Sequence, residues 1–554
     1  MSKGRLQALV YLLTILALIL LARLIELQIF HHDFYKQKAE DQRRRIINLA
    51  AERGDIYDRR GHVLATTLNT FSVAVNPRIF SSPEALSKLL NQPVGALSKK
   101  RAFSWVKRKL AVELAEKIRT AKIPGVFLLP DKKRVYPKGR LASQILGFTG
   151  LDNEGLSGVE LAWDRYLKGK EGRLVTESDP LGYELPQMTE RDEERAHPGM
   201  NMTLTIDETI QYLAERELAK ILMQFKASAG NIIVMDVQNG EILALAGLPD
   251  FDPNDYQKSN FHLWKSRALD VYEPGSTFKV ITACAGLQEG VIQPDEKLKA
   301  LNTLEIGGKV IENSHPINWP GSQISLSFML EKSVNTGAAQ VSLKLGPERF
   351  YRQIRAFGFG DTTGMGLFGE SHGLVRPPEE WFKPDIAMMS FGQSLAVTPL
   401  QLLASYATIA RGGVRVKPIL VKKVESPDGT FVRSSAPEEL NRVLSPQVAE
   451  QAKKLLENVV LFGSGRRAQM KHFRVGGKTG TAQKALPGGR GYMKNRFIAS
   501  FCGFAPLKYP RIAVLVLVDE PQGVIWGETV AGPAFKTVME ESLRYLNVKP
   551  DMIQ

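Results

Sequence analysis

Cysteine is almost absent from this chain of 554 residues, which contains only Cys284 and Cys502. Two isolated cysteines provide neither a disulfide framework nor a metal-binding pair. Each lies in an apolar run, so we expect two buried and inert thiols. The low cysteine content excludes disulfide-rich and zinc-ribbon scaffolds, but it fits either side of a membrane.

Signatures of nucleic-acid-binding modules are also absent: there is neither zinc-finger spacing nor an RNP-type aromatic motif. This absence matters because the formal net charge is +15, and a basic chain can bind nucleic acid, an anionic membrane surface or an acidic polymer. A solvated basic surface without a partner explains the charge equally well. We therefore expect no nucleic-acid partner.

Long apolar runs are absent with one exception, an uncharged stretch from Leu6 to Ala22. Its length approaches the ~20 residues that cross a bilayer as a helix. A cleaved signal peptide is the alternative, but Arg23 and Glu26 stand where small cleavage-site residues are expected. We predict an uncleaved transmembrane helix over residues 6–26 after a cytoplasmic tail, residues 1–5. Basic residues flank the helix on both sides, so charge alone leaves its orientation open.

Residues 27–200 are predicted to form a first, charge-rich region outside the membrane. The turn-rich segment from Arg53 to Gly61 contains Asp58, and we expect this aspartate and the flanking arginines to tie the fold by ion pairs. A polar connection from Thr189 to Gly199 ends the region. Hydrophobic patterning predicts one strand and two helices, over residues 71–75, 82–90 and 105–120.

Residues 201–546 are predicted to form a larger domain, followed by a tail, residues 547–554. Two apolar runs flank Asn239-Gly240, which is a strong hairpin signal. Strands at both ends of the region with helices between them indicate an α/β layer architecture. Further elements are expected as helices over 206–225 and 532–546 and as a strand over 512–518.

The segment Glu273-Pro274-Gly275-Ser276-Thr277-Phe278-Lys279 is the first of three motifs that carry chemistry. Residues 276–289 are predicted to form a helix that stops at Gly290. Ser276 and Lys279, three residues apart, would lie on one helix face. A lysine amine there could take the proton of a serine, which is otherwise a weak nucleophile. The helix N-terminus would add a positive field where an oxyanion forms.

This serine–lysine spacing is a weak signal when it stands alone. The same spacing occurs at Ser104 and Lys107, where nothing else supports catalysis. Both residue types are common, so most such pairs are solvated helix surface.

Ser333-Val334-Asn335, which occurs once, is the second motif. A second hydroxyl can relay a proton, and an amide side chain can hold a substrate carbonyl or the lysine. Serine and asparagine are equally common in helix caps and turns. Taken alone, this motif is therefore better explained as local structure.

Lys478-Thr479-Gly480-Thr481 is the third motif, and it follows two glycines that suit close backbone approach at a strand edge. Lys478 offers a cation for a substrate carboxylate, and the two threonines offer hydroxyls. A second nearby cation would also lower the pKa of Lys279 and favour its neutral, basic form. A phosphate-binding lysine is the alternative, but the glycine spacing of a P-loop is absent.

In this order the three motifs resemble the signature shared by class A β-lactamases and penicillin-binding proteins, with Val334 where that signature has Asp. Over nearly its whole length the chain resembles class B penicillin-binding proteins, the monofunctional transpeptidases. Arg53–Gly61 resembles the first N-terminal motif of that family. Further matches are Gly158-Val159-Glu160, Trp163-Asp164 and residues 236–246.

This resemblance implies an α/β (α+β) transpeptidase domain of the penicillin-binding and serine β-lactamase-like type over 201–546. It also implies a smaller α+β pedestal of the dimerisation type over 27–200 and one N-terminal transmembrane helix. The family is anchored in the cytoplasmic membrane as a single-pass protein, with the catalytic domain outside it. No metal or organic cofactor is implied, because covalent catalysis supplies the chemistry.

Within the family the chain is most similar to the septal, division-specific transpeptidase. Glu273-Pro274-Gly275-Ser276 resembles the division form, and Asn335 fits it better than the Asp usual in the elongation enzyme. The compact N-terminal region and the segments 397–402 and 476–484 also match that branch. We expect no module after the last helix, which argues against sporulation-type and resistance-type variants.

The resemblance also implies roles for the motif residues. Ser276 would attack the D-Ala-D-Ala amide of a peptidoglycan stem peptide, with Lys279 as general base. Ser333 and Asn335 would relay protons and hold the substrate amide, and the backbone N–H groups of Ser276 and Thr481 would form the oxyanion hole. The expected catalytic residues are Ser276, Lys279, Ser333, Asn335 and Lys478. The expected substrate-binding residues are Thr479, Gly480 and Thr481. Lys478, Thr479 and Thr481 would bind the terminal carboxylate.

An amine on a neighbouring strand would then accept the acyl group, whereas β-lactams would leave Ser276 blocked. The pedestal and membrane helix would bind a polytopic membrane-embedded glycosyltransferase and other division proteins, unless they only space the enzyme from the membrane. Rival interpretations are a β-lactamase, a D,D-carboxypeptidase, an elongation-type transpeptidase, and a non-catalytic scaffold or β-lactam sensor. The region 27–200 disfavours the first two, and the intact motifs disfavour the last.

Overall fold

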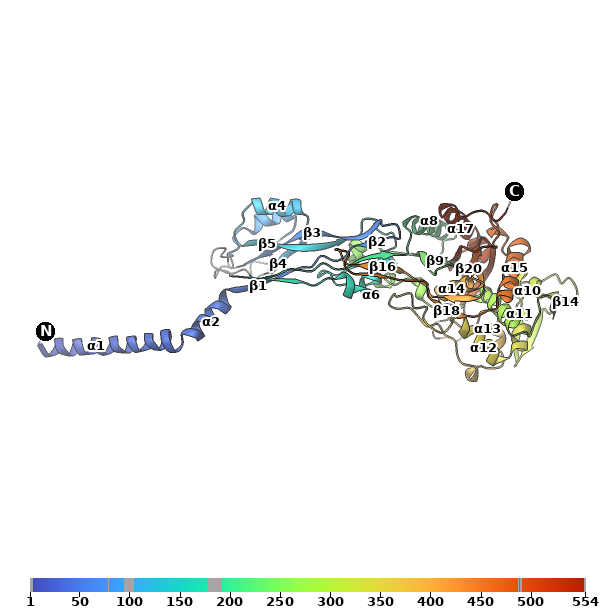
Figure 1. Cartoon of the computed structure of the whole chain (residues 1–554), viewed down its shortest axis with the longest axis horizontal. Helices are drawn as coiled ribbons and strands as arrows, with labels where there is room; N and C mark the ends of the chain where they lie inside the picture. The colour runs from blue at the N-terminus through green and yellow to red at the C-terminus, as the bar shows by residue number, and fades with distance from the viewer. Residues whose placement is uncertain are drawn as a thin grey trace. The chain divides into compact units, whose positions relative to one another are not determined.

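The computed structural model describes residues 3–77, 79–93, 104–177, 192–486, 488 and 491–552 (Figure 1). The chain forms two compact units that are interleaved along the sequence. Unit 1 comprises Met1–Glu52, Leu68–Lys133 and Gly169–Pro198, and unit 2 comprises Arg53–Thr67, Arg134–Lys168 and Gly199–Gln554. The contiguous division at residue 200 stays a prediction. The connection predicted from Thr189 lies partly outside the described residues.

Unit 1 begins with the apolar helix α1 (Lys3–Ile25), which continues through a π-helical turn (Glu26–Phe30) into α2 (His32–Arg43). No residue of α1 is buried. Within the described residues, Lys3–Phe30 is the one helical segment that is long and apolar enough to cross a membrane. The apolar helix predicted over 6–26 is therefore a candidate membrane anchor.

The rest of unit 1 contains two groups of paired strands. One sheet has the order β1-β6-β7, with β1 (Arg44–Leu49), β6 (Gly172–Glu177) and β7 (Asp192–Glu194). In the other, β3 (Val63–Val75), which begins in unit 2 and continues into unit 1, pairs with β4 (Ser104–Leu110) and β5 (Val126–Val135). Helices α3 (Pro83–Leu90) and α4 (Val112–Thr120) complete it. Its apolar core includes Val73, Val75, Leu86, Leu110 and Ile118.

The helix predicted over 105–120 is wrong in its first half. Ser104–Leu110 is strand β4, and only Val112–Thr120 is helical. Phe71 pairs with Leu110 and Val75 with Ser104 in the antiparallel register. This pairing overrides the local sequence preference, because what favours a strand is packing against its neighbour.

A five-stranded antiparallel sheet forms the centre of unit 2 in the order β10-β9-β21-β20-β19. Its strands are β9 (Ala229–Asp236), β10 (Ile242–Leu248), β19 (Gly476–Ala485), β20 (Tyr492–Ala505) and β21 (Ile512–Asp519). The hairpin predicted around Asn239-Gly240 is confirmed, since β9 and β10 pair directly. The predicted strand over 512–518 is confirmed as β21, which lies between β9 and β20.

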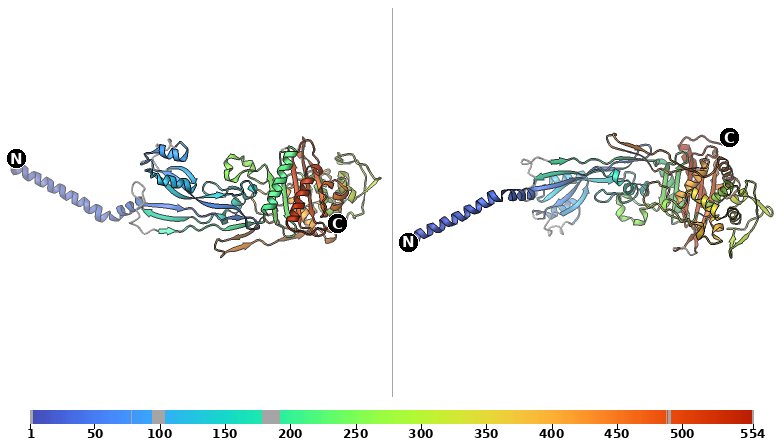
Figure 2. Two further views of the ribbon diagram at one scale, coloured as in Figure 1. Left: turned by 90° about the horizontal axis from the view of Figure 1, so that it is seen from above. Right: turned by 60° about the horizontal axis from the view of Figure 1, so that its bottom comes forward.

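Helices cover both faces of this sheet, which explains why the inner strand β9 is buried along its whole length. Ile232 and Val234 face one core cluster, whereas Ile233 and Met235 face the other. On the first face, α8 (Glu208–Gln224) and α17 (Gly532–Tyr545) lie side by side (Figures 1 and 2). On the second lies α14 (Pro399–Ala410).

The remaining helices of unit 2 build the region beside the sheet. The helix predicted over 276–289 begins as a 3-10 turn, Gly275–Phe278, and continues as α9 (Lys279–Gln288). α10 (Leu326–Glu331), α11 (Asn335–Leu345) and α15 (Pro446–Phe462) pack near α9. The shorter helices are α5 (Ser143–Leu146), α6 (Gly158–Ala162), α7 (Asp164–Leu167), α12 (Pro347–Ala356), α13 (Asp385–Met389) and α16 (Gly527–Val530).

Short strands complete unit 2. β8 (Asn201–Leu204) lies between β2 (Ile56–Tyr57) and β16 (Val421–Glu425), and β17 (Val432–Ser434) pairs with β16. Three further pairs of strands are separate from this sheet. They are β11 (Lys297–Lys299) with β14 (Gln323–Ser325), β12 (Thr303–Ile306) with β13 (Lys309–Glu312), and β15 (Val414–Val416) with β18 (Glu439–Arg442). Both cysteines are free and buried, as predicted, and burial raises the pKa of Cys284 to about 12.

A buried charge cluster centres on Arg53, whose side chain is only 1% exposed. Its Nε lies 2.5 Å from Glu160 Oε2, and its Nη1 lies 2.6 Å from Asp164 Oδ1. Arg134 Nε contacts the other Glu160 oxygen at 2.6 Å. Burial raises the pKa of Glu160, but the two guanidiniums outweigh it and hold the pKa below its ordinary value. The arginine ion pairs expected from the sequence are therefore present.

Candidate active site

Ser276 lies in the 3-10 turn immediately before helix α9. Gly275 has a φ of +57°, which favours glycine, and its N–H donates to the carbonyl of Gly392 at 3.1 Å. The hydroxyl of Tyr406 donates to the Thr277 carbonyl at 2.8 Å from the buried helix α14. These bonds on both sides of Ser276 fix the backbone that carries it.

Lys279 brings its amine to Ser276, as the three-residue spacing predicts. Its Nζ lies 3.0 Å from Ser276 Oγ, 2.6 Å from the Ser333 carbonyl oxygen and 3.0 Å from Ser333 Oγ. The Lys279 side chain is fully buried. Burial lowers the pKa of Lys279 well below its ordinary value, and the charge of Lys478 lowers it further.

A neutral amine accounts for all three contacts of Lys279. A neutral lysine has two N–H groups and one lone pair. The Ser333 carbonyl can only accept, so it takes one N–H, and Ser333 Oγ can take the second. In this neutral form the lone pair faces the hydroxyl of Ser276 at 3.0 Å, the arrangement that removal of its proton requires, whereas a charged amine donates to that hydroxyl.

Ser333 stands between the two buried lysines. Its Oγ lies 3.0 Å from Lys279 Nζ and 3.2 Å from Lys478 Nζ. Its φ is +56°, a left-handed conformation that is rare for serine. The residue thus presents both its carbonyl and its hydroxyl to the same amine. The second and third motifs converge on the first through this one side chain.

Asn335 starts helix α11 and lines the same cleft. Its Nδ2 donates to the Glu312 carbonyl at 2.7 Å. Of the two roles considered for this amide, contact with a substrate is open to it. Contact with the lysine is not made, because among the described residues Asn335 forms no hydrogen bond to Lys279.

The third motif lies on strand β19, at the edge of the sheet. The Lys478 amine is buried and donates to Ser333 Oγ, to the Thr479 carbonyl at 3.1 Å and to Thr479 Oγ1 at 3.2 Å. Burial lowers the pKa of Lys478 to about 7. Gly480 has no room for a side chain, since a Cβ would lie 2.4 Å from Ser500 Oγ.

A cleft of about 960 Å³ opens over these residues. Its wall is formed by the segment that carries Ser276, by strands β13 and β19, and by the segment that leads into helix α16. Lys279 and Lys478 reach the site from behind this wall. The residues that line the cleft include Ser276, Asn313, Ser333, Asn335, Ser464, Thr479 and Thr481.

Asn313 and Ser464 are site residues that the motif analysis missed. Asn313 Oδ1 accepts the backbone N–H groups of Asn335 at 2.9 Å and Thr336 at 3.2 Å, so it caps helix α11 from outside. Ser464 Oγ lies 2.8 Å from Thr479 Oγ1. Both residues meet the motifs only through folding. The sole hint in the sequence is the glycine on each side of Ser464.

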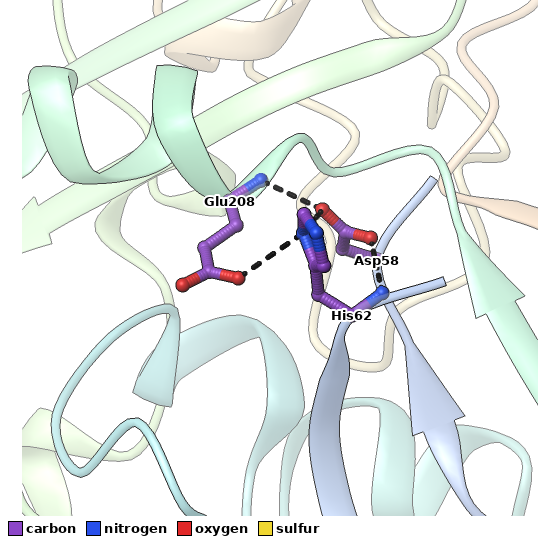
Figure 3. Close-up of side chains that lie close together, drawn as sticks. All are labelled: Asp58, His62 and Glu208. Carbon is purple, nitrogen blue, oxygen red and sulfur yellow. Dashed lines mark hydrogen bonds and ion pairs between the residues drawn. The ribbon is translucent and has the colours of Figure 1, made fainter. Parts of the chain in front are cut away.

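One group of side chains in the described residues has the composition of a metal site: Asp58, His62 and Glu208 (Figure 3). Asp58 Oδ1 accepts the backbone N–H groups of Arg60 and His62, both at 2.8 Å, and Oδ2 accepts that of Glu208 at 3.2 Å. His62 Nδ1 lies 3.2 Å from Asp58. These bonds explain the cluster as a clamp between a turn and helix α8.

Within the described residues, Asp58 and the flanking arginines form ion pairs, as expected, but with other residues and not with one another. The partners of Asp58 are His62 and backbone N–H groups, because Asp58 is fully buried inside the turn that it closes. Arg59 pairs with Glu241 instead, at 3.0 Å.

Family models describe both parts of the chain. The penicillin binding protein transpeptidase domain matches residues 230–540, and the penicillin-binding protein dimerisation domain matches residues 48–204. The fold and the cleft thus define a transpeptidase with a dimerisation-type pedestal domain. The chain belongs to the class B penicillin-binding proteins and is a peptidoglycan D,D-transpeptidase.

Two sequence relatives extend over most of the chain. Peptidoglycan D,D-transpeptidase FtsI of Escherichia coli K12 is 32% identical over 554 residues, covering 96% of this chain and 90% of the relative. Stage V sporulation protein D of Bacillus subtilis 168 is 35% identical over 532 residues, covering 92% and 81%. Among solved structures, Penicillin binding protein 3 from Mycobacterium tuberculosis complexed with aztreonam is 27% identical, with a TM-score of 0.72 and coverage of 91% and 98%.

Proposed function

We propose that this enzyme cross-links stem peptides through an acyl-enzyme formed on Ser276. The observation that carries the proposal is the buried Lys279 amine, 3.0 Å from Ser276 Oγ and held by two atoms of Ser333. Lys279 takes the hydroxyl proton as Oγ attacks the carbonyl of the penultimate D-Ala. The amide C–N bond breaks, and the departing D-Ala amine takes up a proton relayed by Ser333.

The backbone N–H groups of Ser276 and Thr481 hold the negative oxygen of the tetrahedral intermediate. Thr479 and Thr481 donate hydrogen bonds to the terminal carboxylate of the donor, Lys478 binds it through its positive charge, and Asn335 holds the donor amide next to Gly480. In the second half-reaction, an amine of a neighbouring stem peptide attacks the Ser276 ester. Lys279 accepts the amine proton, a new amide forms and the serine hydroxyl is regenerated.

Whether the acyl group passes to an amine or to water distinguishes this proposal from hydrolytic alternatives. Purified full-length protein is incubated with a stem pentapeptide donor with and without an acceptor amine. We expect release of D-Ala together with an acceptor-linked peptide that grows with acceptor concentration. Release of D-Ala with hydrolysis alone supports a D,D-carboxypeptidase. Rapid turnover of a penicillin supports a β-lactamase, and no acylation at all supports a non-catalytic scaffold or sensor.

We further propose that the enzyme acts in septal wall synthesis, with α1 as a single-pass anchor in the cytoplasmic membrane and the catalytic unit outside it. Support comes from Glu273-Pro274-Gly275-Ser276, from Asn335 and from the similarity to FtsI over 90% of that relative's length. The pedestal and anchor then contact a membrane-embedded glycosyltransferase of the division type.

Depletion of the protein in its source bacterium tests the septal role. If the protein acts in division, we expect depleted cells to form filaments with unfinished septa, and we expect a fluorescent fusion to localise at the septum. An elongation enzyme predicts round or bulged cells instead. A sporulation enzyme predicts normal growth with a defect confined to spores, an outcome made relevant by the 35% identity to stage V sporulation protein D.

A further inference from the structure

Ser464 contacts the third motif from a separate part of the chain. Its Oγ lies 2.8 Å from Thr479 Oγ1, and both residues line the cleft. The Ser464 N–H donates to the carbonyl of Glu331, the last residue of α10, at 3.0 Å. Ser464 therefore joins the segment that leads into Ser333 to strand β19.

The turn that carries Ser464 is tightly constrained. Gly463 and Gly465 both donate their N–H groups to the carbonyl of Val459 near the end of helix α15, at 3.1 and 3.0 Å. A Cβ on Gly463 would lie 2.6 Å from the Glu331 carbonyl oxygen. Glycine at this position permits the close approach of α15 to α10. Ser464 is thus presented by a fixed backbone and not by a free loop.

The hydrogen bonds around Thr479 leave one position that the hydroxyl of Ser464 can fill. A charged Lys478 has three N–H groups, which match Ser333 Oγ, the Thr479 carbonyl and Thr479 Oγ1. The hydroxyl oxygen of Thr479 accepts one of these bonds and has a second acceptor position. If Ser464 donates into that position, both acceptor positions of Thr479 Oγ1 are filled. The O–H group of Thr479 is then free to donate into the cleft that Thr479 lines.

We propose that Ser464 is a positioning residue of the carboxylate subsite: by donating to Thr479 Oγ1, it aims the Thr479 proton at the C-terminal carboxylate of the donor peptide. This inference rests on the proposed function, because it needs an anionic donor bound at Lys478 and Thr479. Ser464 touches no reacting atom and acts through Thr479. The ligand class is a peptide or β-lactam with a carboxylate next to the scissile amide.

The test measures the second-order rate constant for acylation of the full-length protein by a fluorescent penicillin, which carries that carboxylate. Ser464→Ala is expected to lower the constant about tenfold, the usual value of one oriented hydrogen bond. The loss should appear as weaker binding before acylation, with the limiting rate little changed. Ser464→Thr keeps the hydroxyl and should restore most of the rate.

A double-mutant cycle separates positioning from a structural role. In a Thr479→Val background there is no hydroxyl to aim, so adding Ser464→Ala should change the rate less than about twofold. An equal loss in both backgrounds would show that Ser464 only supports the fold and would overturn the inference. Ser327→Ala is the matched control, because Ser327 joins the same helices, α10 and α15, through Asn458 but does not contact Thr479.

The outcomes also distinguish this inference from the function on which it rests. Wild type that takes up no label overturns the acyl-enzyme and the inference together. Wild type that is labelled while Ser464→Ala reacts at the same rate overturns the inference alone. Thermal unfolding of each variant identifies a folding defect, and in that case the Ser464→Thr rate decides.

Discussion

The main-chain carbonyl oxygen of Ser333 lies 2.6 Å from the Nζ atom of Lys279, and Ser333 reaches this position with a φ of +56°. A left-handed backbone costs a residue with a side chain roughly 1–2 kcal/mol. The structure maintains this strain at the point where two buried amines meet one hydroxyl. Strain of this kind is typical of functional sites.

Two substitutions at Ser333 separate its strain from its chemistry. Both Ser333→Ala and Ser333→Gly remove the hydroxyl, so both should lower acylation by penicillin about a hundredfold or more, as for loss of a proton relay. Ser333→Gly relieves the backbone strain and should be about 1 kcal/mol more stable than Ser333→Ala. Acylation kinetics and chemical denaturation check the two expectations. A glycine variant less stable than the alanine variant would contradict the assigned strain.

The rate of acylation should depend on pH with two limbs. At low pH, Lys279 is protonated and cannot act as a base, so the rate falls about tenfold per pH unit below its lowered pKa. Above about 7, Lys478 loses the charge that attracts the donor carboxylate, and the rate falls again. Penicillin acylation measured across the pH range checks this profile. A rate that rises steadily up to the ordinary lysine pKa would contradict it.

The stability contribution of Lys478 should change with pH in a defined direction. Its folded pKa of about 7 lies below the ordinary value of 10.5, so the folded state binds fewer protons than the unfolded chain between these values. The free energy of unfolding should therefore rise with pH across this window. Lys478→Met should flatten that part of the curve, measured by denaturant unfolding at several pH values. An unchanged slope in the variant would argue against the lowered pKa.

Glu160 should be essential for the stability of unit 2. It is fully buried between Arg53 and Arg134. Among the described residues, Glu160→Gln leaves Arg134 without an ion-pair partner and Arg53 with only Asp164, and breaking such a buried pair costs about 3–5 kcal/mol. Denaturant unfolding followed by circular dichroism measures the loss. Glu116→Gln, which removes an exposed ion pair with Arg119, is the control and should change stability little; equal losses in the two variants would refute this account.

Asn313 should position the second motif through helix α11. Asn313→Ala removes the acceptor for the N–H groups of Asn335 and Thr336, and loss of a helix cap costs about 1 kcal/mol. Asn313→Asp keeps the acceptor but loses the Nδ2 group that donates to the Leu301 carbonyl at 3.0 Å, so it should restore stability and penicillin acylation in part. Thermal unfolding and labelling rates on the two variants check this. An aspartate variant as impaired as the alanine variant would argue against capping.

Local patterns were enough to predict the elements that local chemistry determines. The turn at Asn239-Gly240 and the β-branched run at 512–518 both give the expected strands. The local pattern over 105–110 predicts a helix, and the segment becomes a strand only by pairing with β3. Local patterns could not predict the order of the strands in the sheet either, because β9 pairs with β21, which lies far from it along the sequence.

The candidate site divides in the same way. The Ser276–Lys279 contact follows from helical spacing, which is a property of local sequence. The contacts of Ser464 with Thr479 and of Asn313 with α11 join segments that only the tertiary fold brings together. The absence of a bond between Asn335 and Lys279 likewise depends on where the Glu312 carbonyl lies.

The most direct test of the central claim is the site of the covalent adduct. Wild type and Ser276→Ala are incubated with a fluorescent penicillin, and the label is followed for hours and mapped by mass spectrometry of peptides. The account predicts a stable adduct on the peptide containing Ser276 and no adduct in the variant. An adduct on another residue, or none on folded wild type, would contradict the acyl-enzyme mechanism.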